Sequence, residues 1–61
     1  MKARFRKFNG HTLREEYVIT GQGAKRRAGE VARQERKYRA YVRVVKRKAG
    51  VYAIYTSKWA L

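Results

Sequence analysis

Arginine and tyrosine side chains recur together in residues 38–59, which hold four of the five tyrosines and the only tryptophan of the sequence. Guanidinium groups neutralise phosphate, while flat rings stack on bases or press between them. This interleaving predicts a surface for a polyanion with planar groups. The alternative is an ordinary cross-strand aromatic pair, Tyr41 with Tyr55, on a solvated face.

The same stretch has the pattern of a β-hairpin, because two β-branched and aromatic runs flank Lys48, Ala49 and Gly50. A three-residue loop ending in glycine suits a type I turn followed by a left-handed position, which glycine adopts without strain. The predicted cross-strand pairs are Arg43–Tyr55, Val44–Ile54 and Arg47–Val51.

Alternation along the two strands then assigns each side chain to a face of the hairpin. The face expected to look into the core is apolar, with Ala40, Val42, Val44, Tyr52 and Ile54. The face expected to meet a partner holds Tyr41, Arg43, Val45, Arg47, Val51, Ala53 and Tyr55.

The net charge indicates the kind of partner. Seventeen Lys and Arg residues against four Glu give +13 in 61 residues, a surplus that costs stability through self-repulsion and is typical of polyanion binding. One small domain, residues 1–61, is expected, and it buries only about 60% of its extended surface. The sequence has no cysteine and no aspartate, which argues against disulfides, metal sites, cofactors and a small-molecule substrate.

An anionic membrane is a weaker alternative as partner, since no long amphipathic helix or apolar anchor is visible. The first residues lead into an alternating strand and show no signal sequence. We therefore expect a soluble, cytoplasmic protein that associates with the nucleoid and is a monomer when free.

The first half of the sequence predicts another hairpin and a helix. Residues 3–8 and 13–20 are expected to pair around Asn9-Gly10, the strongest two-residue hairpin signal in the chain, with His11 and Thr12 lengthening the turn. Glu15 interrupts an otherwise apolar face of the second strand and so suggests an edge position or a bulge. Residues 24–36 should form a helix with small apolar residues at Ala24, Ala28, Val31 and Ala32.

The start of this helix has two interpretations. A Gly-x-Gly turn followed by Lys25, Arg26 and Arg27 offers backbone N–H groups and basic side chains to one phosphate. The spacing of a nucleotide-binding loop is absent. The alternative, which the sequence favours equally, is a flexible connection from strand to helix followed by a solvated basic turn.

The element order strand, strand, helix, strand, strand predicts an α+β fold: a four-stranded antiparallel sheet with one helix packed on one face. Trp59 either closes the core or joins Lys58 on the binding face.

In this order of elements, with Val18-Ile19-Thr20-Gly21, a basic alanine-rich helix and a basic hairpin ending near Lys58-Trp59, the chain resembles the archaeal non-histone chromosomal proteins of methanogens. The resemblance implies a monomer that binds and bends duplex DNA without strong sequence preference, gripping it with residues 43–55 and with Trp59 on the DNA side. The chain lacks that family's longer segment before the third strand and its C-terminal tail, which puts bending in question.

The leading hypothesis is therefore an architectural protein that binds double-stranded DNA without reading its sequence, since no recognition helix is apparent. A small RNA-binding component of a ribosome or other ribonucleoprotein is the alternative, and a protein-interaction module is a third. An enzyme is not expected, because one histidine and four glutamates do not supply an acid–base pair with an orienting group. The residues predicted to contact nucleic acid are Arg4, Arg6, Lys25, Arg26, Arg27, Tyr41, Arg43, Lys46, Arg47, Lys48, Tyr55, Lys58 and Trp59.

Overall fold

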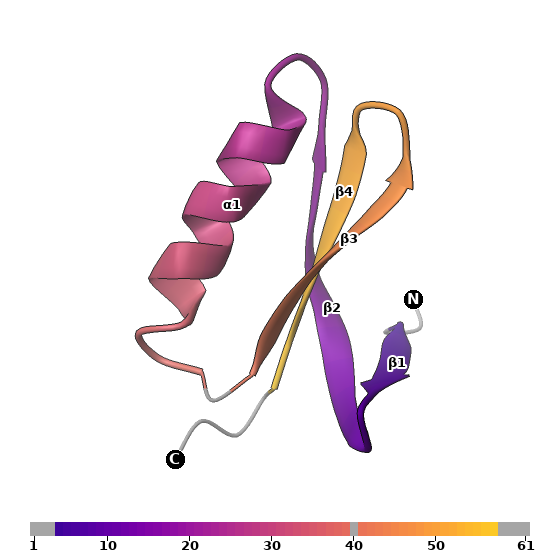
Figure 1. The fold of residues 1–61 in the computed structure, drawn as a ribbon, viewed down its shortest axis with the longest axis vertical. Coiled ribbons are helices and arrows are strands. Elements are labelled where there is room, and N and C mark those ends of the chain that lie inside the picture. Colours follow the sequence, from indigo (N-terminus) through magenta and orange to yellow (C-terminus); the bar gives the residue numbers. More distant parts are fainter. Residues whose placement is uncertain (1–3, 40, 58–61) are drawn as a thin grey trace.

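Among the residues that the structure describes, four antiparallel strands form one curled sheet, and one helix covers one of its faces (Figure 1). The computed structural model describes residues 4–39 and 41–57. Its elements are β1 (Phe5–Phe8), β2 (His11–Thr20), α1 (Ala24–Glu35), β3 (Val42–Lys48) and β4 (Val51–Thr56). The sheet order is β1-β2-β4-β3, so the two hairpins meet through β2 and β4. The predicted α+β class, with its strand, strand, helix, strand, strand order, is confirmed.

The first hairpin turns on Asn9 and Gly10 alone. Both have positive φ, 48° and 85°, as the two central positions of a type I′ turn require. Phe8 pairs directly with His11, so the prediction that His11 and Thr12 lengthen the turn is wrong. Both residues belong to β2, because the tight turn lets pairing begin at once.

The second hairpin has the predicted register except next to its turn. Arg43 pairs with Tyr55 and Val44 with Ile54, and Gly50 has the expected left-handed φ of 74°. Val51, however, pairs with Lys48 instead of Arg47, and the register shifts between Lys46 and Lys48. Arg47 is thus the extra residue of a bulge in β3.

A second bulge lies in β2, where the register shifts between Glu15 and Tyr17. One extra residue reverses the alternation of side chains. Leu13 and Glu15 therefore face away from the helix, while Tyr17 and Ile19 face toward it. Of the two explanations that the sequence allowed for Glu15, the bulge is correct and the edge is not, because β2 lies between β1 and β4.

The core beneath the helix is made of small residues on α1 and branched residues on the sheet. Ala28 and Ala32 pack with Val42 and Ile54, and Ile19, Val31 and Tyr52 border this cluster. Alanines let the helix approach the sheet closely. Val44, expected in this core, is instead 38% exposed, and Ala40 lies outside the described residues.

The opposite face of the sheet holds a second core, which the sequence did not predict. Leu13, Ala53 and Tyr55 form a buried cluster with Phe8 and Val45 at its border. Ala53 and Tyr55 are 0% and 4% exposed, so assigning them to a face that meets a partner is wrong. The curled sheet brings β1 and β2 over these residues, and the protein thus divides its apolar residues between two thin cores.

Polar contacts hold the end of α1 against β2. The Tyr17 hydroxyl donates to Oε2 of Glu35 at 3.0 Å, and Arg39 forms ion pairs with Glu35 (3.5 Å) and Glu16 (3.9 Å). The hydrogen bond and the charge of Glu35 raise the pKa of Tyr17.

In residues 4–39 and 41–57 no helix has the length and hydropathy needed to cross a membrane.

Candidate nucleic-acid interface

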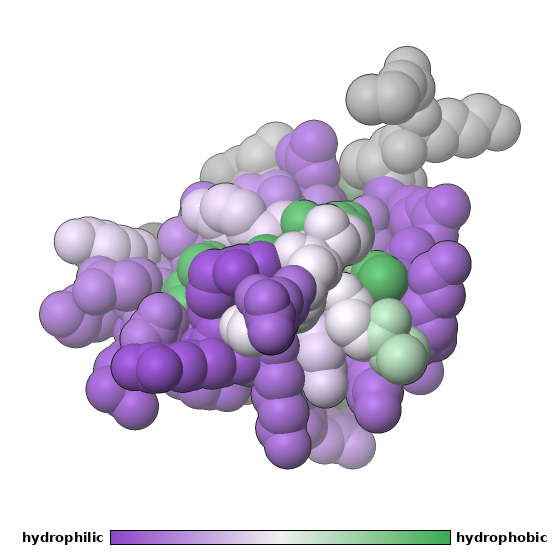
Figure 2. All heavy atoms as spheres, turned by 90° about the horizontal axis from the view of Figure 1, so that it is seen from above, coloured by the Kyte–Doolittle hydropathy of each residue, from purple (hydrophilic) through white to green (hydrophobic). Residues whose placement is uncertain are grey.

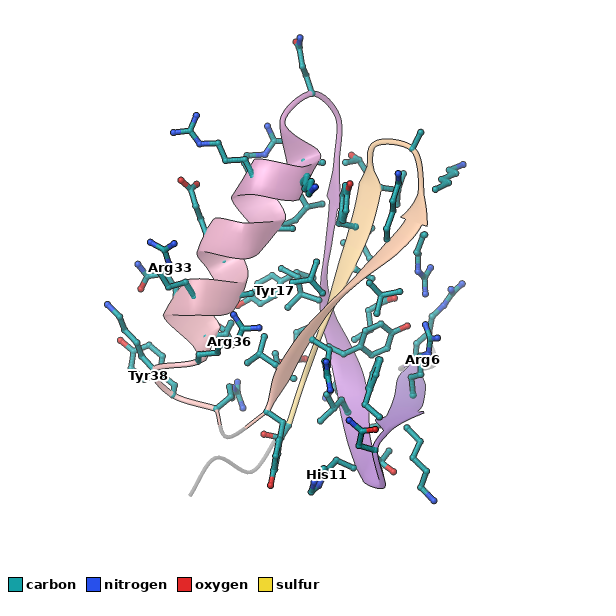
Figure 3. The ribbon with its side chains drawn as sticks, in the orientation of Figure 1. Arg6, His11, Tyr17, Arg33, Arg36 and Tyr38 are labelled. Atoms are coloured by element: carbon teal, nitrogen blue, oxygen red, sulfur yellow. The ribbon has the colours of Figure 1, made fainter. Side chains whose placement is uncertain are left out.

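Two arginines from opposite edges of the sheet contact one aromatic ring. The guanidinium carbon of Arg6, on β1, lies 5.3 Å from the centroid of the Phe8 ring, and that of Arg43, on β3, lies 6.0 Å from it. Both side chains are exposed, and Figure 3 shows Arg6 on the side of the sheet away from the helix. We call this surface the arginine face; it consists of Arg6, Phe8, His11, Tyr41 and Arg43.

Stacked rings complete the arginine face. Phe8 contacts Tyr55 edge-on, with ring centroids 5.4 Å apart, and His11 stacks on Tyr41 with centroids 4.0 Å apart. Tyr41 is 46% exposed, so part of this stacked pair is accessible to a ligand. Tyr41, Arg43 and Arg6 are predicted site residues that the fold brings to one surface.

Phe8 and His11 are members of this surface that the sequence did not identify. The spacing Arg6-x-Phe8 was visible as a basic residue alternating with an aromatic one. The contact of Phe8 with Arg43 depends on the curl of the whole sheet, and no local sequence pattern predicts it.

Tyr55 and Arg47, two of the predicted site residues, contact each other within the protein. Tyr55 is buried and has no surface to offer a nucleic acid. Arg47 donates to the Tyr55 hydroxyl at 3.3 Å, which raises the pKa of Arg47. Its Nη2 also lies 2.7 Å from Oε2 of Glu15. Arg47 therefore neutralises a carboxylate on this face, and its charge is already balanced.

The predicted basic residues of the helix start and of the second hairpin come together at one end of the molecule. The amide of Gly21 donates to the carbonyl of Gly50 at 3.1 Å, which joins the β2–α1 loop to the β3–β4 turn. Figure 2 looks onto this end and shows hydrophilic side chains over most of it. On one side of this junction the first turn of α1 contains Lys25, Arg26 and Arg27, and on the other side β3 ends with Lys46, Arg47 and Lys48.

The Arg27 side chain is hydrogen-bonded to the backbone just before α1. Its two terminal nitrogens donate to the carbonyls of Gln22 (2.7 Å) and Thr20 (2.6 Å). Of the two interpretations of the helix start, these bonds favour the structural one for Arg27. Arg26 lies 3.8 Å from Glu30, which leaves Lys25 as the basic residue of this turn with neither kind of partner among the described residues.

Arg4 extends the arginine face along β1. Its carbonyl accepts the amide of Glu15 at 2.8 Å, which continues the pairing of β1 with β2 and puts Arg4 on the same side as Arg6. Lys58 and Trp59, also predicted site residues, lie outside the described residues.

Every glutamate is already paired with arginine. Glu15 pairs with Arg47, Glu16 with Arg14 and Arg39, Glu30 with Arg26, and Glu35 with Arg39. Among residues 4–39 and 41–57, these basic side chains have no carboxylate within ion-pair distance: Arg4, Arg6, Lys7, Lys25, Arg27, Arg33, Arg36, Lys37, Arg43, Lys46 and Lys48. In the same part of the chain no three His, Cys, Asp or Glu side chains gather as metal ligands.

Comparison of the chain with protein-family models, with curated proteins and with solved structures found no match, so the resemblance to the methanogen chromosomal proteins stays a prediction.

Proposed function

We propose that this protein binds double-stranded DNA without sequence preference and that the arginine face is its main contact with the phosphate backbone. On this proposal the protein is not an enzyme, acts as a monomer and is associated with the nucleoid in the cytoplasm. Bending of the DNA is not part of the proposal.

The observation that supports it most is that Arg6 and Arg43 both contact Phe8, while neither has a carboxylate within ion-pair distance among the described residues. Both guanidinium carbons lie within 6.0 Å of one ring centroid, and two cations around one ring repel one another. The ring offsets part of that cost, by about 0.5–1 kcal/mol for each exposed cation. A phosphate between the two groups would turn the remaining repulsion into attraction.

The same geometry favours a ligand recognised by its backbone. Arginines that contact an aromatic ring still have N–H groups to donate to phosphate oxygens. Duplex DNA has about one negative charge per 1.7 Å of axis, a charge density suited to a +13 chain. Contacts of this kind position a protein without reading base pairs.

The test is the salt dependence of binding to a fluorescently labelled duplex of random sequence, measured by anisotropy. Each phosphate contact contributes about 0.9 to the slope of log K against log salt. We expect Arg6→Ala with Arg43→Ala to lower that slope by about two units and to weaken binding equally for unrelated sequences.

Lys7→Ala is the matched control, because Lys7 is the next residue of β1 and points to the other side of the strand. It removes one charge and should change the slope by less than Arg6→Ala does. A slope that stays the same in the double variant would rule out the arginine face as a contact with the phosphate backbone. Tighter binding to a structured RNA than to the duplex would favour a ribonucleoprotein component instead.

A further inference from the structure

The outer side of α1 is a second basic surface, which the arginine face does not include. A shallow, open groove there is lined by Gly23, Lys25, Arg26, Gly29, Glu30 and Arg33. Lys25, Gly29 and Arg33 are four residues apart and so stand in one row along the helix. A Cβ at Gly29 would meet no atom within 4 Å, so the middle of the row is open. We call Lys25, Gly29 and Arg33 the helix row.

The helix row and the arginine face lie on opposite sides of the sheet. The inner side of α1, with Ala28 and Ala32, packs on the sheet together with Val42 and Ile54. At 3.6 residues per turn, the helix row is centred about a quarter turn from Ala28 and Ala32, so it runs along the flank of α1. The arginine face lies on the other side of the sheet. Figure 3 shows Arg33 and Arg6 at opposite sides of the molecule.

The chemistry of the helix row suits a phosphate backbone. Lys25 and Arg33 have no carboxylate within ion-pair distance among the described residues, since Glu30 is paired with Arg26. Glycine between two cations allows a bulky strand to approach the helix backbone. Tyr38, just beyond α1, is 71% exposed and lies on the same side as Arg33 in Figure 3, where it offers a ring for stacking or wedging.

We propose that a second segment of duplex DNA binds along the helix row, so that one molecule bridges two duplexes. This inference rests on the proposed function, because it takes the arginine face as the first site. The thinnest dimension of the protein is 23 Å between Cα atoms, whereas charges in physiological salt are screened over about 8 Å. Two duplexes held on opposite faces therefore repel each other weakly.

The test measures bridging and single-duplex binding separately, with the full chain. A biotinylated duplex on beads is mixed with a fluorescent duplex of unrelated sequence and a sub-saturating amount of protein, and the captured fluorescence is recorded. Anisotropy with one duplex reports the first site alone.

The informative variant is Gly29→Glu. The new carboxylate would pair with Lys25 and Arg33 at i±4, and glutamate forms helix better than glycine, so the chain should still fold. Gly29→Gln is the control, since it has nearly the same size without the charge. Capture by Gly29→Glu should fall at least about tenfold below that of Gly29→Gln, because two phosphate contacts are lost, while single-duplex binding changes far less.

Each other outcome has a distinct meaning. Equal capture by the Glu and Gln variants would show that the helix row does not bind the second duplex, and bridging would then be attributed to self-association of the protein. A native protein that binds one duplex but captures no second one would overturn this inference and leave the proposed function in place. Failure to bind a single duplex would overturn the proposed function itself.

Discussion

At the scale of single residues, the informative contact is the hydrogen bond from Tyr17 to Glu35, because it links β2 to the end of α1. The bond and the negative carboxylate favour the neutral phenol, so the pKa of Tyr17 is raised above its ordinary value of 10.0. A raised folded pKa means that this contribution to stability is complete below about pH 10 and is lost as the pH rises through the folded pKa.

Tyr17→Phe tests this linkage. Urea unfolding of the native chain and the variant from pH 8 to 11.5 should show a constant difference in the free energy of unfolding up to about pH 10. Above that pH the difference should shrink, since the phenolate of the native chain repels Glu35. Lysines that titrate in the same range affect both proteins equally and cancel. A difference independent of pH throughout would show that the hydrogen bond is not formed in solution.

At the scale of elements, α1 contains a glycine that its backbone does not require. Gly29 has no positive φ, and a Cβ there would meet no atom within 4 Å. Replacing glycine by alanine in a helix interior is therefore expected to stabilise the fold by about 0.5–1 kcal/mol. In a domain of this size, the melting temperature should rise by about 4–8 °C per kcal/mol.

Gly29→Ala is checked by thermal unfolding followed by circular dichroism. Gly50→Ala is the contrasting variant, because Gly50 has a φ of 74°, which alanine adopts only with strain. We expect the first substitution to raise the melting temperature and the second to lower it. A lower melting temperature for Gly29→Ala would mean that the middle of α1 is not helical in solution.

At the scale of the whole molecule, stability depends on two thin cores, one on each face of the sheet. Leu13 is 1% exposed at the centre of the second core, although it lies far from α1 in the fold. Leu13→Ala should cost about 2–5 kcal/mol, which is a large part of the stability of a small domain. Val18→Ala is the control on the same strand: Val18 is 49% exposed, and its truncation should cost about 0.5 kcal/mol or less.

Urea unfolding followed by far-ultraviolet circular dichroism measures both variants. A Leu13→Ala protein as stable as Val18→Ala would mean that the second core does not form, and the arginine face above it would lose its support.

The sequence by itself determined the features that depend on neighbouring residues. The period-2 runs, the Asn9-Gly10 turn, the left-handed Gly50 and the alanine stripe of α1 all depend on local geometry, and all appear in the structure. The net charge, which motivates the search for a polyanion, is likewise a property of composition alone.

Only the tertiary structure decided which side chains are available to a ligand. The sheet has two bulges of one residue each, one at Arg47 and one between Glu15 and Tyr17. Each bulge moves the side chains beyond it to the other face of the sheet. The curl of the sheet then buried Tyr55 and brought Arg6 to Arg43 over Phe8. Partners such as Glu15 for Arg47 come from different strands. Their meeting depends on strand order and curvature, which are set by the packing of the whole chain and leave no trace in local sequence patterns.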